Sequence, residues 1–156
     1  MKKTNAMREL DKKKIKYDVK EYEVDENDLG AIAVSIKTGQ DITKIFKTLV
    51  LMTDKQEMLV VCIPGADNID LKKLAKVAQV KKVEMLEMKN LLAMTGYVRG
   101  GCSPIGIKKR HRAFIHESAL LKDEIMISAG VRGMQIILNP KDLIEYLNME
   151  VADVIL

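Results

Sequence analysis

Apolar residues recur at helical spacing in five parts of the chain, around residues 6–10 and over residues 29–36, 71–78, 88–94 and 140–147. Thr4 and Asp70 precede two of these stretches and are residue types that cap helices through their side-chain oxygens. Glycines follow two others, where they commonly end a helix, and an Asn-Pro pair begins the last. Each of the five stretches is therefore predicted to be a helix.

Apolar runs of a different kind lie between these helices. Residues 45–52 and 58–63 are apolar and flank a polar segment, which predicts a β-hairpin with at least one buried strand. An extended segment is expected from Tyr17 to Val24, and further strands over residues 113–116, 125–128, 134–138 and 151–155. Helices and strands interleave without a regular βαβ repeat, so the pattern predicts a mixed α/β fold with helices packed around a mixed sheet.

The least regular segment is residues 97–109, which contains Gly100, Gly101, Pro104 and Gly106 and is predicted to be a loop. Glycines allow backbone N–H groups to approach a phosphate or an oxyanion closely. The spacing matches neither a Walker loop nor a dinucleotide-binding fingerprint. On the sequence alone, a binding loop and a tight structural turn are equally compatible with this segment.

The composition excludes several classes of protein. A chain of 156 residues, 47% hydrophobic and 31% charged, is typical of a globular protein, and residues 1–156 are expected to form one domain. The first residues lack the apolar region of a signal peptide, and no apolar run is long enough to span a membrane. The two cysteines are far apart, which fits a reducing cytoplasm, and two histidines without a Cys or acidic cluster predict no metal site. We therefore expect a cytoplasmic protein without a membrane partner.

The net charge of +4 is concentrated in one segment. Residues 72–112 contain eleven basic and two acidic side chains, while the other segments are neutral or acidic. This distribution is compatible with a solvated lysine face and with a phosphate-binding face. Four Tyr, two Phe and no Trp make a base-stacking platform unfavourable.

A few side chains are candidates for chemistry. Lys47 lies within an apolar strand, where a lysine needs a partner or a solvent-filled cavity. Arg132 lies in a glycine-flanked turn and has donors suited to a carboxylate or phosphate, although a surface role is the commoner one. Cys102 is interpreted as packing rather than as a nucleophile. Met85 and Met88 could line a pocket, but a core role is favoured.

Several motifs, taken in order, resemble the YbaK/EbsC family of aminoacyl-tRNA deacylases, which is related to the editing domain of bacterial prolyl-tRNA synthetases. The motifs span nearly the whole chain and are Phe46-Lys47-Thr48-Leu49, Leu71-Lys72-Lys73-Leu74-Ala75, Lys81 to Met85, Thr95-Gly96-Tyr97, Gly100 to Gly106 and Arg132-Gly133. The resemblance implies a mixed sheet or pseudo-barrel surrounded by helices. It also implies deacylation of Cys-tRNA(Pro), and of Cys-tRNA(Cys), without a cofactor or metal.

The resemblance also implies roles for individual residues. Lys47 would be the essential pocket lysine, and Gly101 would present a backbone donor to the substrate. Other substrate-binding positions would be Tyr22, Leu29, Thr48, Gly100, Ser128, Arg132 and Gln135. The tRNA partner, rather than DNA, would be held by Lys72, Lys73, Lys76, Lys108, Lys109 and Arg110.

Two departures from the family pattern leave alternatives open. Gln135 stands where cysteine-specific members have an aspartate, and Leu29 stands where many have an aromatic residue. Both residues would border the pocket, so hydrolysis of another small misacylated residue, such as alanine on tRNA(Pro), remains an alternative. A non-catalytic tRNA- or synthetase-binding module is a second alternative. The resemblance is also compatible with a complex that includes prolyl-tRNA synthetase.

Overall fold

The protein is described by a computed structural model that covers residues 2–156. All five predicted helices are present, with shifted bounds: α1 (Asn5–Lys12), α2 (Ala31–Thr38), α3 (Leu71–Ala78), α4 (Leu91–Thr95) and α5 (Pro140–Leu147). The caps explain where they begin. The Thr4 hydroxyl accepts the Met7 N–H at 3.3 Å, and the Asp70 carboxylate accepts the N–H groups of Lys72 and Lys73 at 3.0 and 3.1 Å.

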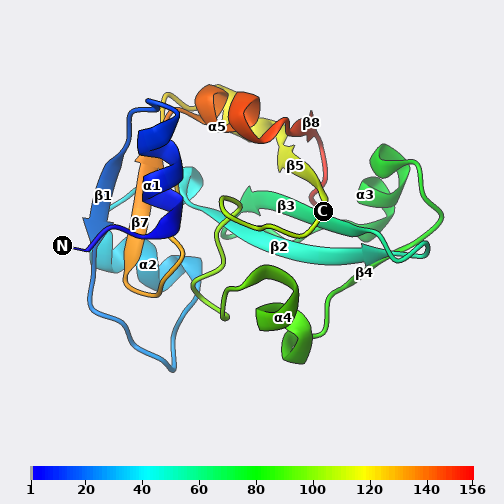
Figure 1. Cartoon of the computed structure of the whole chain (residues 1–156), viewed down its shortest axis with the longest axis horizontal. Coiled ribbons are helices and arrows are strands. Elements are labelled where there is room, and N and C mark those ends of the chain that lie inside the picture. Colours follow the sequence, from blue (N-terminus) through cyan, green and yellow to red (C-terminus); the bar gives the residue numbers. More distant parts are fainter. Residues whose placement is uncertain (1) are drawn as a thin grey trace.

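The strands form two sheets (Figure 1). The larger consists, in spatial order, of β4 (Val83–Met85), β2 (Phe46–Thr53), β3 (Met58–Pro64), β5 (Arg112–His116) and β8 (Glu150–Ala152). It is mixed: β2 and β3 form the predicted antiparallel hairpin, and β5 runs parallel to β3. The smaller is antiparallel, with the order β1 (Asp18–Glu21), β7 (Met134–Leu138) and β6 (Ile125–Ser128). The expected mixed α/β architecture is confirmed.

Two strands differ from the prediction. β4 (Val83–Met85) was not predicted because it has three residues, of which only Val83 is buried. β8 spans Glu150–Ala152 rather than residues 151–155, and Ile155 instead forms an isolated bridge with Ile69. Short 3-10 turns, Ile42–Lys44, Met88–Asn90 and Glu117–Leu121, connect other elements.

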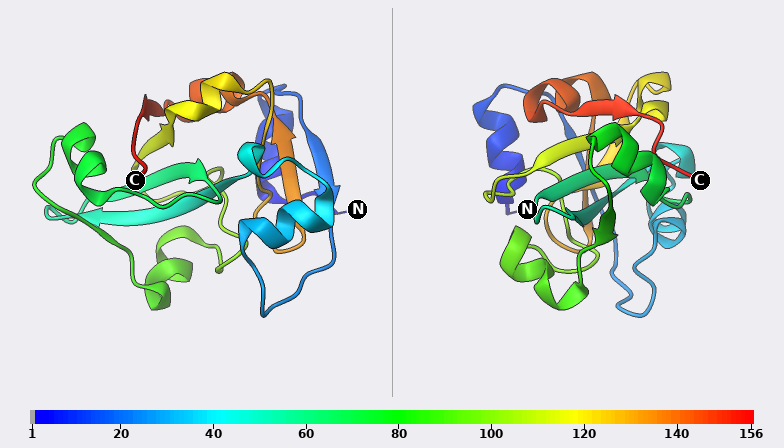
Figure 2. Two further views of the ribbon diagram at one scale, coloured as in Figure 1. Left: turned by 180° about the vertical axis from the view of Figure 1, so that it is seen from behind. Right: turned by 90° about the vertical axis from the view of Figure 1, so that its right-hand side faces the viewer.

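The alternation of side chains along β2 and β3 separates two layers of core. Leu49 and Leu51 share one face with the residues that pack against α3. Val50 and Val60 share the other face with the side chains around α4. Helices α3 and α4 therefore cover opposite faces of the larger sheet (Figures 1 and 2). Helix α1 buries Ala6, Met7 and Leu10 in a third cluster, which includes residues of both sheets.

The two sheets meet at the beginning of β2. Ile45 forms a parallel bridge with Met126 of β6, just before β2 begins. β4 pairs with β2 only over Leu51–Thr53, and the Leu86 N–H extends that pairing to the Val50 carbonyl at 3.0 Å. Residues 47–49, between this bridge and the β4 pairing, thus have no strand beside them on this edge, among the residues that the structure describes. This free edge opens into the candidate site.

Candidate active site

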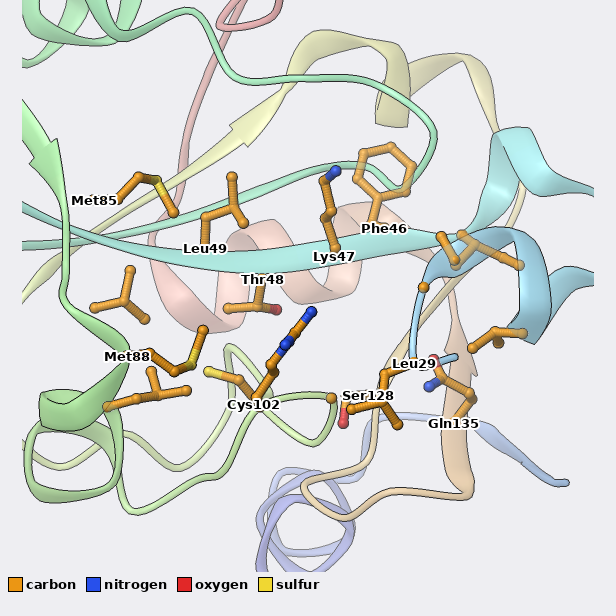
Figure 3. A pocket seen from close by; sticks show the side chains of 18 of the residues that line it. Leu29, Phe46, Lys47, Thr48, Leu49, Met85, Met88, Cys102, Ser128 and Gln135 are labelled. Carbon is orange, nitrogen blue, oxygen red and sulfur yellow. The ribbon is translucent and has the colours of Figure 1, made fainter. Parts of the chain in front are cut away.

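A cavity of 390 Å³ lies along the free edge of β2, between the two sheets and α4 (Figure 3). It brings together residues from segments far apart in the sequence, as expected of a functional site. The candidates that line it are Lys47, Tyr22, Leu29, Thr48, Gly100, Ser128 and Gln135. Arg132 and Gly101 do not line the cavity; they support the loop beside it.

Lys47 and Thr48 leave opposite sides of β2 at the cavity, because adjacent side chains of a strand alternate (Figure 3). Lys47 is half-buried, and this burial lowers the pKa of its ammonium group, an effect that the negative charge of Asp67 partly opposes. The sequence-based expectation that Lys47 needs a cavity is confirmed. Thr48 Oγ1 lies 3.7 Å from Sγ of Cys62, the fully buried residue paired with it on the neighbouring strand β3.

The backbone of β2 also faces the cavity. Val50 directs its carbonyl toward β4, where it accepts the Leu86 N–H. Because residues two positions apart in a strand direct their backbone groups to the same side, the N–H and C=O groups of Thr48 face the free edge. The sheet leaves these groups available to a ligand in the cavity.

The polar wall of the cavity comes from the smaller sheet. Ser128 of β6 and Gln135 of β7 are paired directly across the two strands, and Gln135 is 6% exposed. Gln135 Nε2 lies at hydrogen-bond range, 3.5 Å, from Tyr22 Oη. The Ser128 hydroxyl accepts the Gly130 N–H at 3.1 Å, which shapes the turn after β6. This wall therefore presents neutral polar groups.

The glycine-rich loop forms a third side, and here one expectation is wrong. The Gly101 N–H donates to the Val98 carbonyl at 2.9 Å, so it is already engaged within the loop and is not directed to a ligand. A Cβ atom at Gly101 would lie 3.3 Å from the Val131 and Arg132 backbone. Glycine is needed here for close packing. Arg132 Nε donates to the Arg99 carbonyl at 2.8 Å and ties this loop to the turn after β6.

The apolar part of the cavity contains residues for which a core role was favoured. Met85 and Met88 line the cavity and are 47% and 59% exposed, so they are not core residues. Leu49, Leu86 and Leu91 lie beside them. Arg99, which sequence reasoning had counted only as a basic residue, also lines the cavity. Its position directly before Gly100 is the signal that could have identified it.

The cysteines have no property of an activated nucleophile. Burial raises the pKa of the Cys102 thiol to about 11, and a hydrogen bond with Thr95 opposes this only in part. Burial raises the pKa of the Cys62 thiol to about 12. Both groups are neutral thiols at physiological pH. The buried His116 accepts the Val154 N–H through Nδ1 at 3.3 Å and lies outside the cavity.

The basic residues predicted to hold tRNA do not line the cavity. Lys72, Lys73 and Lys76 are on α3, and Lys108, Lys109 and Arg110 are exposed in the loop before β5. Lys73 forms a salt bridge with Asp153 at 2.9 Å. Three more basic residues of the 72–112 segment pair with nearby carboxylates: Lys82 with Glu84, Lys89 with Glu87, and Arg112 with Glu57.

Among residues 2–156, no cluster of three His, Cys, Asp or Glu side chains has the geometry to hold a metal ion. None of the helices in the same range has both the length and the apolar character needed to cross a membrane.

Comparisons with known proteins agree with the motifs in the sequence. A family model for the aminoacyl-tRNA editing domain matches residues 29–146. A protein of Enterococcus faecalis, provisionally named Cys-tRNA(Pro)/Cys-tRNA(Cys) deacylase EbsC, is 45% identical over 152 residues, which cover 97% of this chain and 93% of that protein.

Solved structures share the fold at low sequence identity. The hypothetical protein APE2540 has a TM-score of 0.87 and 18% identity, over 96% of this chain and 97% of that one. A protein provisionally described as a trans-editing enzyme for prolyl-tRNA synthetase has a TM-score of 0.79 and 21% identity, over 90% of this chain and 87% of that one. With the family model matching most of its length and a relative this similar in sequence, the chain belongs to the aminoacyl-tRNA editing domain family.

Proposed function

We propose that the protein is a deacylase that removes cysteine from mischarged Cys-tRNA(Pro), and also from Cys-tRNA(Cys). The observation that carries this proposal is the convergence of Lys47, the free edge of β2 and the neutral wall of Ser128 and Gln135 on one cavity. The family membership and the name of the E. faecalis relative support the same activity.

The nucleophile in this mechanism is supplied by the substrate. The sulfur of the cysteinyl group forms a bond to its own ester carbonyl carbon, and the ester C–O bond breaks. The thiol proton is transferred to the departing ribose oxygen, so that tRNA and a cyclic thiolactone are released. The neutral thiols of Cys62 and Cys102 fit this scheme, because the enzyme needs no nucleophile of its own.

The protein's task is then to hold the ester in a reactive geometry and to stabilise developing negative charge. We assign the ammonium group of Lys47 to the ester, and the backbone N–H of Thr48 at the free edge to its carbonyl oxygen in place of Gly101. Gln135, Ser128 and Tyr22 would surround the aminoacyl group. The apolar part of the cavity, with Met85, Met88 and Leu91, would accept the terminal adenosine.

A second candidate is hydrolysis of Ala-tRNA(Pro) by a water molecule. The observation that favours it is Gln135, an amide where cysteine-specific relatives have a carboxylate. A complex with prolyl-tRNA synthetase is a further proposal, which would supply tRNA selectivity. The site of action would be the cytoplasm, where aminoacyl-tRNAs are used.

A deacylation panel tests the proposal, using Cys-tRNA(Pro), Cys-tRNA(Cys), Ala-tRNA(Pro) and Pro-tRNA(Pro) at equal concentrations. We expect rapid loss of cysteine from both tRNAs and no loss of proline. Activity on alanine but not on cysteine would replace the first candidate by the second. Inactivity on all four substrates would favour a non-catalytic binding module. Co-sedimentation with prolyl-tRNA synthetase, with and without tRNA, tests the complex.

A further inference from the structure

Positive charge is concentrated on and around the N-terminal helix, although residues 1–28 as a whole carry no net charge. Residues 2–16 contain seven basic and two acidic side chains, whereas residues 17–28 contain one basic and six acidic side chains. The seven basic residues, all exposed, are Lys2, Lys3, Arg8, Lys12, Lys13, Lys14 and Lys16. Arg8 and Lys12 lie on α1 itself, which buries Ala6, Met7 and Leu10, and the other five residues flank the helix on both sides. These seven residues are called the basic face of α1.

Most of this charge is not neutralised within the protein. Over the described range 2–156, Lys3 is the one of these seven residues that forms a salt bridge, with Asp11. In the 72–112 segment, by contrast, four of the eleven basic residues are paired with carboxylates. The basic residues around α1 are thus closely spaced in sequence and largely unpaired, as a site for an external polyanion requires.

The basic residues at the start of α1 lie close to the active-site cavity. A second hollow, of 470 Å³, lies between the N-terminal turn of α1 and the turn after β6, and is lined by Lys2, Lys3, Arg8, Tyr97 and Gly130. The segments that form it also form the active-site cavity: Ser128 and Gly100 line the cavity, while Gly130 and Tyr97 line the hollow. Figure 1 shows the start of α1 beside these loops.

The other side of the cavity has the opposite charge. Residues 17–28 lead directly to Leu29 in the cavity wall and contain Asp25, Glu26 and Asp28. A polyanion bound in the cavity by its end would be repelled from this segment and attracted toward α1. The charges thus favour a path toward α1 for a nucleic-acid chain that leaves the cavity.

We infer that the basic face of α1 binds the phosphate backbone of the tRNA acceptor stem, which passes from the cavity across the turn after β6 and along the helix. This inference rests on the proposed function and adds the surface and direction of RNA binding to it. Helix α1 is about 12 Å long at 1.5 Å per residue and has basic residues beyond both of its ends, so these charges can reach several successive phosphates. Contacts of this kind need no aromatic stacking.

Two matched triple variants test the inference. The first, Lys2→Gln, Arg8→Gln and Lys12→Gln, removes three charges from the α1 face. The control, Lys72→Gln, Lys76→Gln and Lys81→Gln, removes three exposed charges on and near α3, on the opposite face of the larger sheet from α4. Both variants have the same net charge, so long-range electrostatics alone would affect them equally.

The first readout is binding of an RNA hairpin of acceptor-stem length that ends in CCA, measured by fluorescence anisotropy at several salt concentrations. For the α1 variant we expect an affinity about tenfold lower than that of the wild type, and a slope of log affinity against log salt reduced by about two to three. For the α3 variant we expect little change. Equal effects, or a larger effect in the α3 variant, would overturn the inference.

The second readout separates this inference from the proposed function. Cysteinyl-adenosine has the ester but no acceptor stem, so we expect the α1 variant to deacylate it at the wild-type rate while its KM for Cys-tRNA rises. That rate also shows that the variant is folded. A wild-type protein inactive on both substrates would contradict the proposed function itself. An active wild type with an unaffected α1 variant would contradict only the role of α1.

Discussion

Arg132 Nε donates a hydrogen bond to the backbone carbonyl of Arg99 at 2.8 Å, and this contact joins two loops that border the cavity. The Arg132 side chain is mostly buried, and its Nη1 is also 3.9 Å from a Glu26 carboxylate oxygen. Because the guanidinium group spans both partners, a lysine cannot reproduce this arrangement. Arg132 is therefore a positioning residue for Arg99 and Gly100.

We predict that Arg132→Lys lowers kcat/KM for Cys-tRNA(Pro) by about tenfold, the effect of losing one hydrogen bond from a charged donor. Hydrogen exchange of the 98–101 amides should become faster in the same variant. Arg112→Lys, outside the cavity at a guanidinium group that donates to the Glu57 carboxylate and the Ala78 carbonyl, is the control for a general Arg-to-Lys effect. Unchanged exchange at residues 98–101 would show that the contact does not hold the loop.

Replacement of Lys47 should have the largest effect. Lys47→Met keeps most of the side-chain volume but removes the charge, and we expect it to lower kcat by at least about a hundredfold, in the range found for loss of one preorganised electrostatic group. Lys47→Arg should recover part of the activity if charge alone is required. Wild-type rates in Lys47→Met would remove this residue from the mechanism.

The lowered pKa of Lys47 predicts how activity depends on pH. Because burial disfavours its charged form, the ammonium group is lost below the ordinary lysine pKa of 10.5 as the pH rises. An activity that needs this charge should therefore fall at alkaline pH, after subtraction of spontaneous ester hydrolysis. The same shift means that the folded protein gains stability as the pH rises through this range, because the unfolded chain binds the proton more tightly. Carbon-13 NMR of reductively methylated protein, assigned with Lys47→Arg, measures this pKa.

Gln135 provides a test of amino-acid selectivity. We expect Gln135→Glu to bring a negative charge near the α-ammonium group of the substrate and to lower KM for Cys-tRNA(Pro) by about tenfold, since hydrogen bonds to a charged partner are about twice as strong as neutral ones. Steady-state kinetics with Cys-tRNA(Pro) and Ala-tRNA(Pro) would show whether the gain applies to both. Tyr22→Phe, which removes the hydroxyl beside Gln135, is the matched control for a disturbed wall. An increase in KM for both substrates in Gln135→Glu would place the α-ammonium group elsewhere.

Cys102 distinguishes a substrate nucleophile from an enzyme nucleophile. With a thiol pKa of about 11, Cys102 should react slowly with iodoacetamide at neutral pH. Cys102→Ala should lower kcat by less than about tenfold, an effect of altered packing in the cavity wall. A loss of several orders of magnitude, or a covalent cysteinyl adduct detected by mass spectrometry, would assign the nucleophile to the protein.

The parts of the fold set by local sequence could be predicted, because caps and side-chain periodicity act within a few residues. Thr4 and Asp70 cap the helices that follow them. Lys47 could be identified because a lysine within an apolar strand needs a charged partner or a solvent-filled cavity. β4 could not be predicted in this way. Its three residues become a strand only through pairing with Leu51–Thr53.

The remaining differences in the site also depend on tertiary contacts. Met85 and Met88 look like core residues because their hydrophobicity is the same in a core and in a cavity wall. The Gly101 N–H looked available because its partner, the Val98 carbonyl, is fixed by the fold of the loop. The charge of α1 was concealed because the acidic residues that follow it in sequence lie on another element.

The bridge between Ile45 and Met126 connects the two sheets at one end of the cavity, so the cavity lies where the sheets meet. One wall of the cavity belongs to β2 and the opposite wall, with Ser128 and Gln135, to the smaller sheet. A ligand that touches both walls acts as a clamp and prevents the sheets from separating. Binding should therefore raise the melting temperature, and above Kd the gain in stability should grow with the logarithm of the ligand concentration.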